Sequence, residues 1–295
     1  MYSMGTDVIF TEGKGRNQDM FSRSKKKKVY VIDIFGVIEA ASSSISLSKK
    51  NTNMQKVIKT LHKIAGKDKE EVVGVIIHLN TPGGTTGTSE EAAMMIEKVR
   101  EIGIPVIASI ADICCSGGYW IASACDYIFA NRTSMTGSIG VIMQLPNING
   151  LSDKLGVKQV TVKAGRMKDI GNPFRELTEE ERDFLQEHAE ETHEIFKEAV
   201  RKNRRKIPAD VPEIFDGRPF SADFALQNHL IDEIGTFYDA LDYLLDKAGV
   251  EEKDIKLQQN VEKKGLISKL FSLEVDNSLV NVLADYLSGK SLSSR

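Results

Sequence analysis

Three short runs of β-branched and aliphatic residues constrain the fold of this 295-residue chain more than any other feature. They cover residues 29–34 (Val-Tyr-Val-Ile-Asp-Ile), 72–79 (Val-Val-Gly-Val-Ile-Ile-His-Leu) and 105–110 (Pro-Val-Ile-Ala-Ser-Ile). Near-continuous apolar runs of this length are typical of strands that are covered on both faces. The three runs therefore predict buried strands of one sheet.

Helical patterns alternate with these runs. Between the second and third runs, Thr88 and Glu91 have the spacing of a capping box, and apolar residues then follow one helical face until Gly103. A strand, a helix and a strand in this order form a parallel crossover unit. The chain is therefore expected to have an α/β fold, with helices on the faces of its sheet.

Further elements follow along the chain. A short strand is expected at 127–130, and the Thr178–Glu181 spacing predicts a second capping box that opens a long amphipathic helix to about Asn203. Residues 236–248 predict another helix, and the apolar residues between 265 and 288 predict a helical tail. The tail could dock on its own domain, on a sister subunit or on a membrane surface.

Composition and charge exclude some classes of function. The net charge of −3 and the isoelectric point near 6.0 provide no general attraction for nucleic acid or anionic membranes. The N-terminus lacks a signal-peptide pattern, and the longest apolar stretch, residues 103–115, is shorter than the roughly 20 residues that span a bilayer. Three cysteines without disulfide or zinc spacing suit a reducing compartment. We expect a soluble cytoplasmic protein without an integral membrane segment, and peripheral membrane association remains open.

Glycine-rich turns follow the second and third apolar runs, where sites gather in α/β sheets. The turn at 80–85 (Asn-Thr-Pro-Gly-Gly-Thr) is either a tight turn into a helix or a set of amides that can hold an oxyanion. In the next turn, Ser116 precedes two glycines and a short apolar helix. That serine is either a nucleophile or a simple helix cap. Cys115 is a rival nucleophile, but no histidine lies nearby in sequence to activate it.

The five histidines offer no convincing base for a serine nucleophile. His78 interrupts an apolar run and is expected to be a satisfied core residue, whereas His188 and His193 lie in a charged helix and are expected at the surface. A lysine base is the remaining possibility. It needs desolvation, because an ammonium with an ordinary pKa of about 10.4 is almost never neutral at pH 7. The residues themselves do not select one lysine among many.

Several ordered motifs resemble those of the signal peptide peptidase A family of serine–lysine peptidases, which have the Clp-protease and crotonase type of fold. The similarity covers residues 29 to about 248. The matching segments are Leu79–Gly84, Ser116–Tyr119, Met135–Val141, Ala164–Ile170, Phe215–Arg218 and Leu230–Gly235.

The resemblance implies a role for each matching residue. Ser116 would be the nucleophile and Lys168 the general base, with Ser138 orienting the lysine and the amides of Gly83 and Gly117 forming the oxyanion hole. It also implies a peptide substrate and a homo-oligomeric ring with active sites at subunit interfaces, so that Lys168 could serve Ser116 of a neighbour. Neither a cofactor nor a metal is expected.

The expected organisation has three parts: a flexible polar arm over 1–28, the peptidase domain over 29–250, and a helical C-terminal extension over 251–295. The expected activity is that of a serine endopeptidase acting on signal-peptide remnants or other largely apolar peptides. Two alternatives remain, a crotonase-like enzyme acting on an acyl-coenzyme A and a non-catalytic ring-forming scaffold. Many relatives carry an N-terminal membrane anchor, which the polar arm of this chain does not resemble.

Overall fold

An eight-stranded sheet forms the centre of the molecule in the computed structural model, which describes residues 26–40 and 51–259. The strands are β1 (Lys27–Phe35), β2 (Val72–Thr81), β3 (Val106–Cys115), β4 (Tyr127–Ala130), β5 (Met135–Gly137), β6 (Pro219–Ser221), β7 (Glu233–Ile234) and β8 (Ile255–Gln259). Their order is β6-β5-β3-β2-β1-β8, and β4 pairs with β3 and β7. The neighbouring strands are parallel except β5 and β6, which are antiparallel. The α/β class predicted from the sequence is confirmed.

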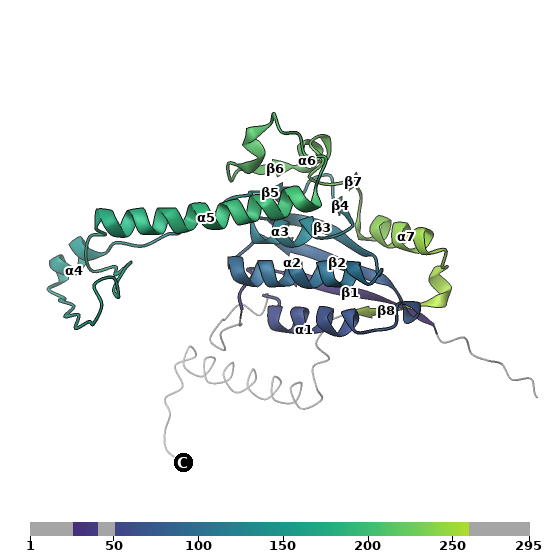
Figure 1. Cartoon of the computed structure of the whole chain (residues 1–295), viewed down its shortest axis with the longest axis horizontal. Helices are drawn as coiled ribbons and strands as arrows, with labels where there is room; N and C mark the ends of the chain where they lie inside the picture. The colour runs from purple at the N-terminus through teal and green to yellow at the C-terminus, as the bar shows by residue number, and fades with distance from the viewer. Residues whose placement is uncertain (1–25, 41–50, 260–295) are drawn as a thin grey trace, which may run out of the picture.

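Helices cover both faces of this sheet (Figure 1). They are α1 (Met54–Ala65), α2 (Thr86–Glu101), α3 (Gly117–Ser123), α4 (Asn149–Leu155), α5 (Glu179–Asn203), α6 (Ala222–Gln227) and α7 (Phe237–Ala248). Helices α1, α2, α3 and α5 lie side by side and share one apolar core with the sheet. Helix α7 buries Leu241 and Leu244 in a second core, together with Ile76 and Phe129 of the strands. The two cores account for the apolar strands, because both faces are removed from water.

The register of the central strands brings two turns together. Leu79 of β2 lies opposite Ile110 of β3, and after a shift in register Thr81 lies opposite Cys114. Because parallel strands end at the same edge of a sheet, the glycine turn after Thr81 lies beside the turn that follows Cys115.

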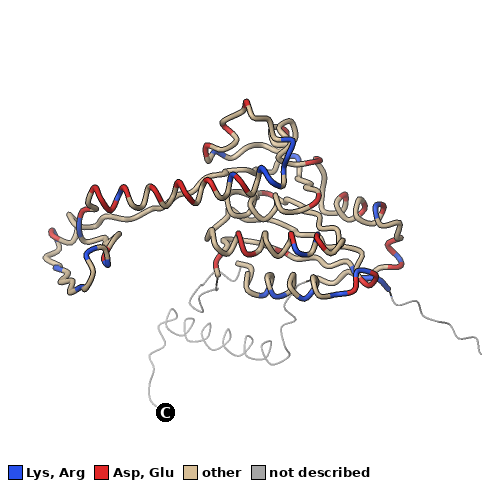
Figure 2. The backbone as a smooth tube through the Cα atoms, in the orientation of Figure 1, with Lys and Arg blue, Asp and Glu red and all other residues tan. Residues whose placement is uncertain are grey.

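Residues 141–178, which we call the projection, extend away from the sheet and lie at the N-terminal end of α5 (Figure 1). Helix α5 has 25 residues, which corresponds to about 37 Å. Its C-terminal half packs on α3, where the rings of Phe196 and Trp120 stack with centroids 4.6 Å apart. Charged residues of both signs follow its length (Figure 2). Its N-terminal half therefore carries the projection well away from the core.

The structure agrees with some of the local expectations and contradicts others. The Thr178 capping box, the helix to Asn203 and the strand at 127–130 are confirmed. The capping box at Thr88 is wrong: α2 begins at Thr86, so Thr88 lies inside the helix and is buried. The sheet continues past the domain boundary expected at residue 250, since β8 pairs with β1.

Other expectations lie outside the described residues. These include most of the polar arm over 1–28 and the helical tail expected between 265 and 288. In the part of the chain that is described, no helix is both long and apolar enough to cross a bilayer.

Candidate active site

Ser116 occupies a strained turn between β3 and α3. Its backbone has φ 52° and ψ −124°, a conformation that costs a non-glycine residue on the order of 1–3 kcal/mol. The backbone is held on both sides: the Ser116 amide donates to the carbonyl of Gly137 at 2.8 Å, and the Ser116 carbonyl accepts from the amide of Trp120 at 3.0 Å. Although Ser116 stands at the N-cap position of α3, its side chain makes no capping hydrogen bond. The hydroxyl is therefore available for chemistry, and the simple-cap interpretation is not supported.

Gly83 lies against this turn so closely that no side chain fits between them. A Cβ at Gly83 would lie 2.8 Å from the carbonyl oxygen of Cys115, 2.9 Å from the amide nitrogen of Gly117 and 2.9 Å from the Cβ of Ser116. The φ of Gly83 is +102°, which also favours glycine. The first glycine turn thus forms one wall of the Ser116 site.

The amides of these turns differ in whether they are free to hold an oxyanion. The Gly83 amide donates to Thr81 Oγ1 at 3.0 Å, so it is already occupied. The amides of Gly84 and Gly117 have no hydrogen-bond acceptor among the described residues. They are also close, since the Gly84 nitrogen lies 3.5 Å from the position of a Cβ on Gly117. The geometry supports Gly117 as an oxyanion donor, and it favours Gly84 over the predicted Gly83 as the second donor.

Ser138 lies on the other side of Ser116. Strand β5 pairs with β3 so that Gly137 is opposite Cys115, which places Ser138 beside the nucleophile turn. Ser138 also has a positive φ, of 51°, and its hydroxyl donates to the carbonyl of Gly217 at 2.9 Å. Because that proton is committed, the lone pairs of the Ser138 oxygen can accept a hydrogen bond from an amine.

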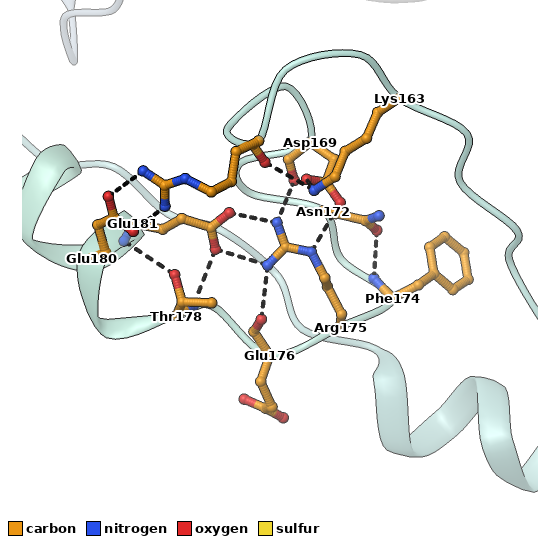
Figure 3. Close-up of polar contacts among 10 residues, drawn as sticks. Lys163, Asp169, Asn172, Phe174, Arg175, Glu176, Thr178, Glu180 and Glu181 are labelled. Atoms are coloured by element: carbon orange, nitrogen blue, oxygen red, sulfur yellow. Dashed lines mark hydrogen bonds and ion pairs between the residues drawn. The ribbon is translucent and has the colours of Figure 1, made fainter.

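Lys168 does not reach this cluster within one chain. It belongs to the projection, where its amide donates to the Gly165 carbonyl at 3.2 Å. Its side chain is exposed and forms no hydrogen bond or ion pair with any described residue. The next residue, Asp169, is tied through Arg175 to Glu181 at the start of α5 (Figure 3). The Ser116 site lies farther along the same helix, where His193 contacts the carbonyl of Ile139. From Glu181 to His193 is about 18 Å of helix, farther than a lysine side chain reaches.

None of the five histidines, all of which lie in the described ranges, forms a hydrogen bond with Ser116. His78 Nδ1 lies 3.2 Å from a carboxylate oxygen of Asp33 and is half-buried, as expected for a satisfied histidine. His193 is a correction: it is not a free surface group but is half-buried, with Nε2 3.0 Å from the Ile139 carbonyl oxygen. A serine–histidine pair is therefore not formed.

The rival nucleophile Cys115 is disfavoured. Burial raises its pKa to about 11, so the reactive thiolate is scarce near neutral pH. Cys114 and Cys125 are also buried and unpaired, with pKa values raised by burial. Ser116, which is half-buried and makes no capping hydrogen bond, remains the better nucleophile of this turn.

A serine at a strained strand-to-helix turn, with free amides beside it, is the arrangement of a serine hydrolase. The model of peptidase family S49 matches residues 98–251, a range that includes Ser116, Ser138 and Lys168. A protein of Methanocaldococcus jannaschii named as a protease is 35% identical over 260 residues, which are 88% of this chain and 82% of the relative. The chain belongs to peptidase family S49, and it is a serine peptidase.

The chain is also similar to a bacterial relative and to a solved structure. A protein of Enterococcus faecium named as a signal peptide peptidase, SppA, is 36% identical over 221 residues, which are 75% of this chain and 64% of the relative. The chain therefore matches slightly less than two thirds of that relative's length. A solved structure of the 1510-N membrane-bound stomatin-specific protease is 14% identical, with a TM-score of 0.49, covering 85% of this chain and 99% of the other. The mixed sheet with helices on both faces agrees with the α/β class expected from the sequence.

Sequence reasoning missed three features of the site. The sequence motifs indicate Gly83 and not Gly84 as an oxyanion donor, because only the position of Thr81 Oγ1 shows which amide is occupied. The contact of His193 with the Ile139 carbonyl joins residues 54 positions apart, so no local sequence pattern indicates it. The ion-pair chain from Asp169 to Glu181 was signalled only by the charge of Arg175 near Lys168.

Proposed function

We propose that the chain is a serine endopeptidase that uses Ser116 of one subunit and Lys168 of a neighbouring subunit. The observation that supports it most is the Ser116 turn, where an uncapped hydroxyl is held at a positive φ beside free backbone amides. Such strain persists only where the surrounding structure enforces it, and it concentrates at functional sites.

The proposed chemistry assigns one role to each of these groups. A neutral Lys168 would take the proton of Ser116 as the hydroxyl oxygen attacks a peptide carbonyl. The amides of Gly117 and Gly84 would donate to the oxyanion, and each such donor contributes about 3 kcal/mol in comparable acyl-transfer sites. The lysine then protonates the leaving amine. In the second half it activates water, which releases the acyl group and restores Ser116.

A site shared between subunits explains why Lys168 is distant from Ser116 in one chain. The projection, to which Lys168 belongs, extends away from the sheet at the N-terminal end of α5 (Figure 1), so a neighbouring copy could approach it. Several apolar residues of the projection are exposed, among them Ile142, Leu155 and Val160. Exposed apolar residues at this density favour burial in an assembly. A homo-oligomeric ring, as expected from the family resemblance, would bring each Lys168 to a Ser138 hydroxyl that is ready to accept.

The substrate we propose is an extended and largely apolar peptide, such as a signal-peptide remnant. Residues 141–148 have no helix or strand and begin three positions after Ser138, with Ile142, Met143 and Leu145 exposed. An extended segment of this kind can pair with a peptide by strand addition while apolar side chains enter neighbouring pockets. The name of the E. faecium relative points to the same substrate class.

The location we propose is the cytoplasm. The three cysteines of the chain are unpaired and buried, as suits a reducing compartment. Acyl-coenzyme A chemistry is not favoured, because the family and its protease-named relatives are peptidases.

Active-site labelling tests the nucleophile and the base. A fluorophosphonate probe should label the wild-type protein, fail on Ser116→Ala and react far more slowly with Lys168→Met. Lys206→Met is a matched control, because Lys206 is an exposed lysine three residues beyond the C-terminal end of α5. Persistent labelling of Ser116→Ala would overturn the nucleophile, and wild-type labelling of Lys168→Met would overturn the base.

A further inference from the structure

The carboxylate of Asp169 is the acidic group next to Lys168 in the chain. Both of its oxygens are occupied (Figure 3). Oδ2 accepts from Nε of Arg175 at 3.0 Å, and Oδ1 pairs with the ammonium of Lys163. The Asp169 side chain is only 12% exposed, whereas Lys168 is exposed and unpaired within the described residues. The acid nearest to the proposed base in sequence is thus engaged elsewhere.

Arg175 connects this carboxylate to the first turn of α5. Its guanidinium donates to both oxygens of Glu181, at 2.7 and 2.5 Å, and to the backbone carbonyl of Asp169 at 3.0 Å. Glu181 in turn closes the capping box with Thr178, where its carboxylate accepts from the Thr178 amide at 3.0 Å. One planar guanidinium therefore fixes both the backbone and the side chain of Asp169 to a helix end.

The charged side chains around Lys168 form four ion pairs among themselves. They belong to Lys163, Arg166, Asp169, Arg175, Glu180 and Glu181. Arg166 pairs with Glu180, but this pair is exposed, with 70% and 58% of the two side chains accessible. The Glu181 side chain is only 4% exposed. The ion pairs of Arg175, whose own side chain is 30% exposed, are therefore shielded from water better than the ion pair of Arg166.

We infer that Arg175 is a positioning residue for Lys168, which holds the Asp169 carboxylate against α5 and so prevents it from pairing with the proposed base. This inference rests on the function proposed above. Without Arg175, Asp169 would keep only its ion pair with Lys163, whose side chain is 34% exposed, and its Oδ2 could turn toward the neighbouring lysine. A carboxylate within about 4–6 Å favours the protonated ammonium, by about one to three pH units. The enzyme would then need a higher pH before its base is neutral.

The pH dependence of kcat/KM for peptide hydrolysis by the full assembled protein tests this role. Arg175→Met should move the acidic limb of the profile upward by about one pH unit or more, with about a tenfold loss of activity at neutral pH per unit. Arg166→Met is the matched control, because it removes the same charge from the same loop without freeing Asp169. It should leave the limb in place and the activity within about twofold.

A second substitution separates positioning from a merely structural effect. Arg175→Met combined with Asp169→Asn removes the carboxylate as well, so the acidic limb should return to its wild-type position. Should Arg175→Met fail to fold, Arg175→Lys replaces it, since lysine keeps the charge but lacks the two-pronged contact. An unshifted limb in the folded single variant, or a shifted limb that Asp169→Asn does not restore, would overturn the inference.

The turnover of Lys168→Met distinguishes a failure of the proposed function from a failure of this inference alone. If Lys168→Met keeps wild-type turnover, Lys168 is not the base and the proposed function fails with this inference. If Lys168→Met is inactive while Arg175→Met has the wild-type profile, only the role of Arg175 is refuted.

Discussion

Gly83→Ala tests the close contact between the first glycine turn and the nucleophile turn. The new Cβ would lie 2.8 Å from the Cys115 carbonyl oxygen and 2.9 Å from the Ser116 Cβ, distances that Cβ atoms essentially never show. Both neighbours belong to tightly held backbone, since the Ser116 amide is bonded to the Gly137 carbonyl. The substitution must therefore displace one turn relative to the other.

Two contributions set the expected magnitude. A positive φ of 102° costs alanine about 1–2 kcal/mol of stability relative to glycine, before any clash is counted. Displacement of the reacting atoms by about 1 Å costs roughly a hundredfold in rate. We therefore expect a folded variant with a measurably lower melting temperature and at least a hundredfold slower reaction with a fluorophosphonate probe.

Gly87→Ala provides the control. Gly87 lies in the first turn of α2, four residues further on, and a Cβ there would meet nothing within 4 Å. Alanine is the better helix former by about 1 kcal/mol, so this variant should be slightly more stable and label at the wild-type rate. Wild-type labelling of Gly83→Ala, with the same melting temperature, would refute the reasoning.

Two further predictions concern α5. Phe196→Ala removes a fully buried ring that stacks on Trp120, and it should lower the free energy of unfolding by about 3–5 kcal/mol in denaturant titration; a loss below 1 kcal/mol would contradict this packing. Arg175 lowers the pKa of Glu181 from 4.5 to about 2. Because the folded pKa is depressed, the stabilisation by this carboxylate is complete above about pH 4.5 and is lost as the pH falls toward 2. An NMR titration of the Glu181 carboxyl carbon in the folded protein should have its midpoint near pH 2. A midpoint near pH 4.5 would contradict the lowered pKa.

The central sheet was predictable because its strands are encoded locally. The apolar runs beginning at Val29 and Val72 need no tertiary information to be recognised as buried strands. The capping box at Thr178 was equally readable, since both partners lie within four residues. The same spacing at Thr88 predicted a capping box that the structure does not have, because α2 begins two residues before Thr88 and that threonine is buried.

The candidate site was less predictable, because it depends on contacts between distant segments. Sequence motifs placed Ser116 in a turn, but the positive φ and the uncapped hydroxyl depend on how β5 and the Gly83 turn pack around it. Likewise, the occupied amide of Gly83 follows from one threonine rotamer. The distance of Lys168 from Ser116 could not be read from motif order, which contains no information on the projection.

Mixing two inactive variants tests most directly whether the active site is shared between subunits. Ser116→Ala lacks the nucleophile and Lys168→Met lacks the base, so neither should hydrolyse peptide alone. If subunits exchange after dissociation and reassembly, a Lys168→Met subunit supplies Ser116 and its Ser116→Ala neighbour supplies Lys168. The shared site predicts that mixed assemblies regain a substantial part of the wild-type activity. Fully exchanged assemblies that remain inactive, alongside a wild-type control that survives the same treatment, would contradict it.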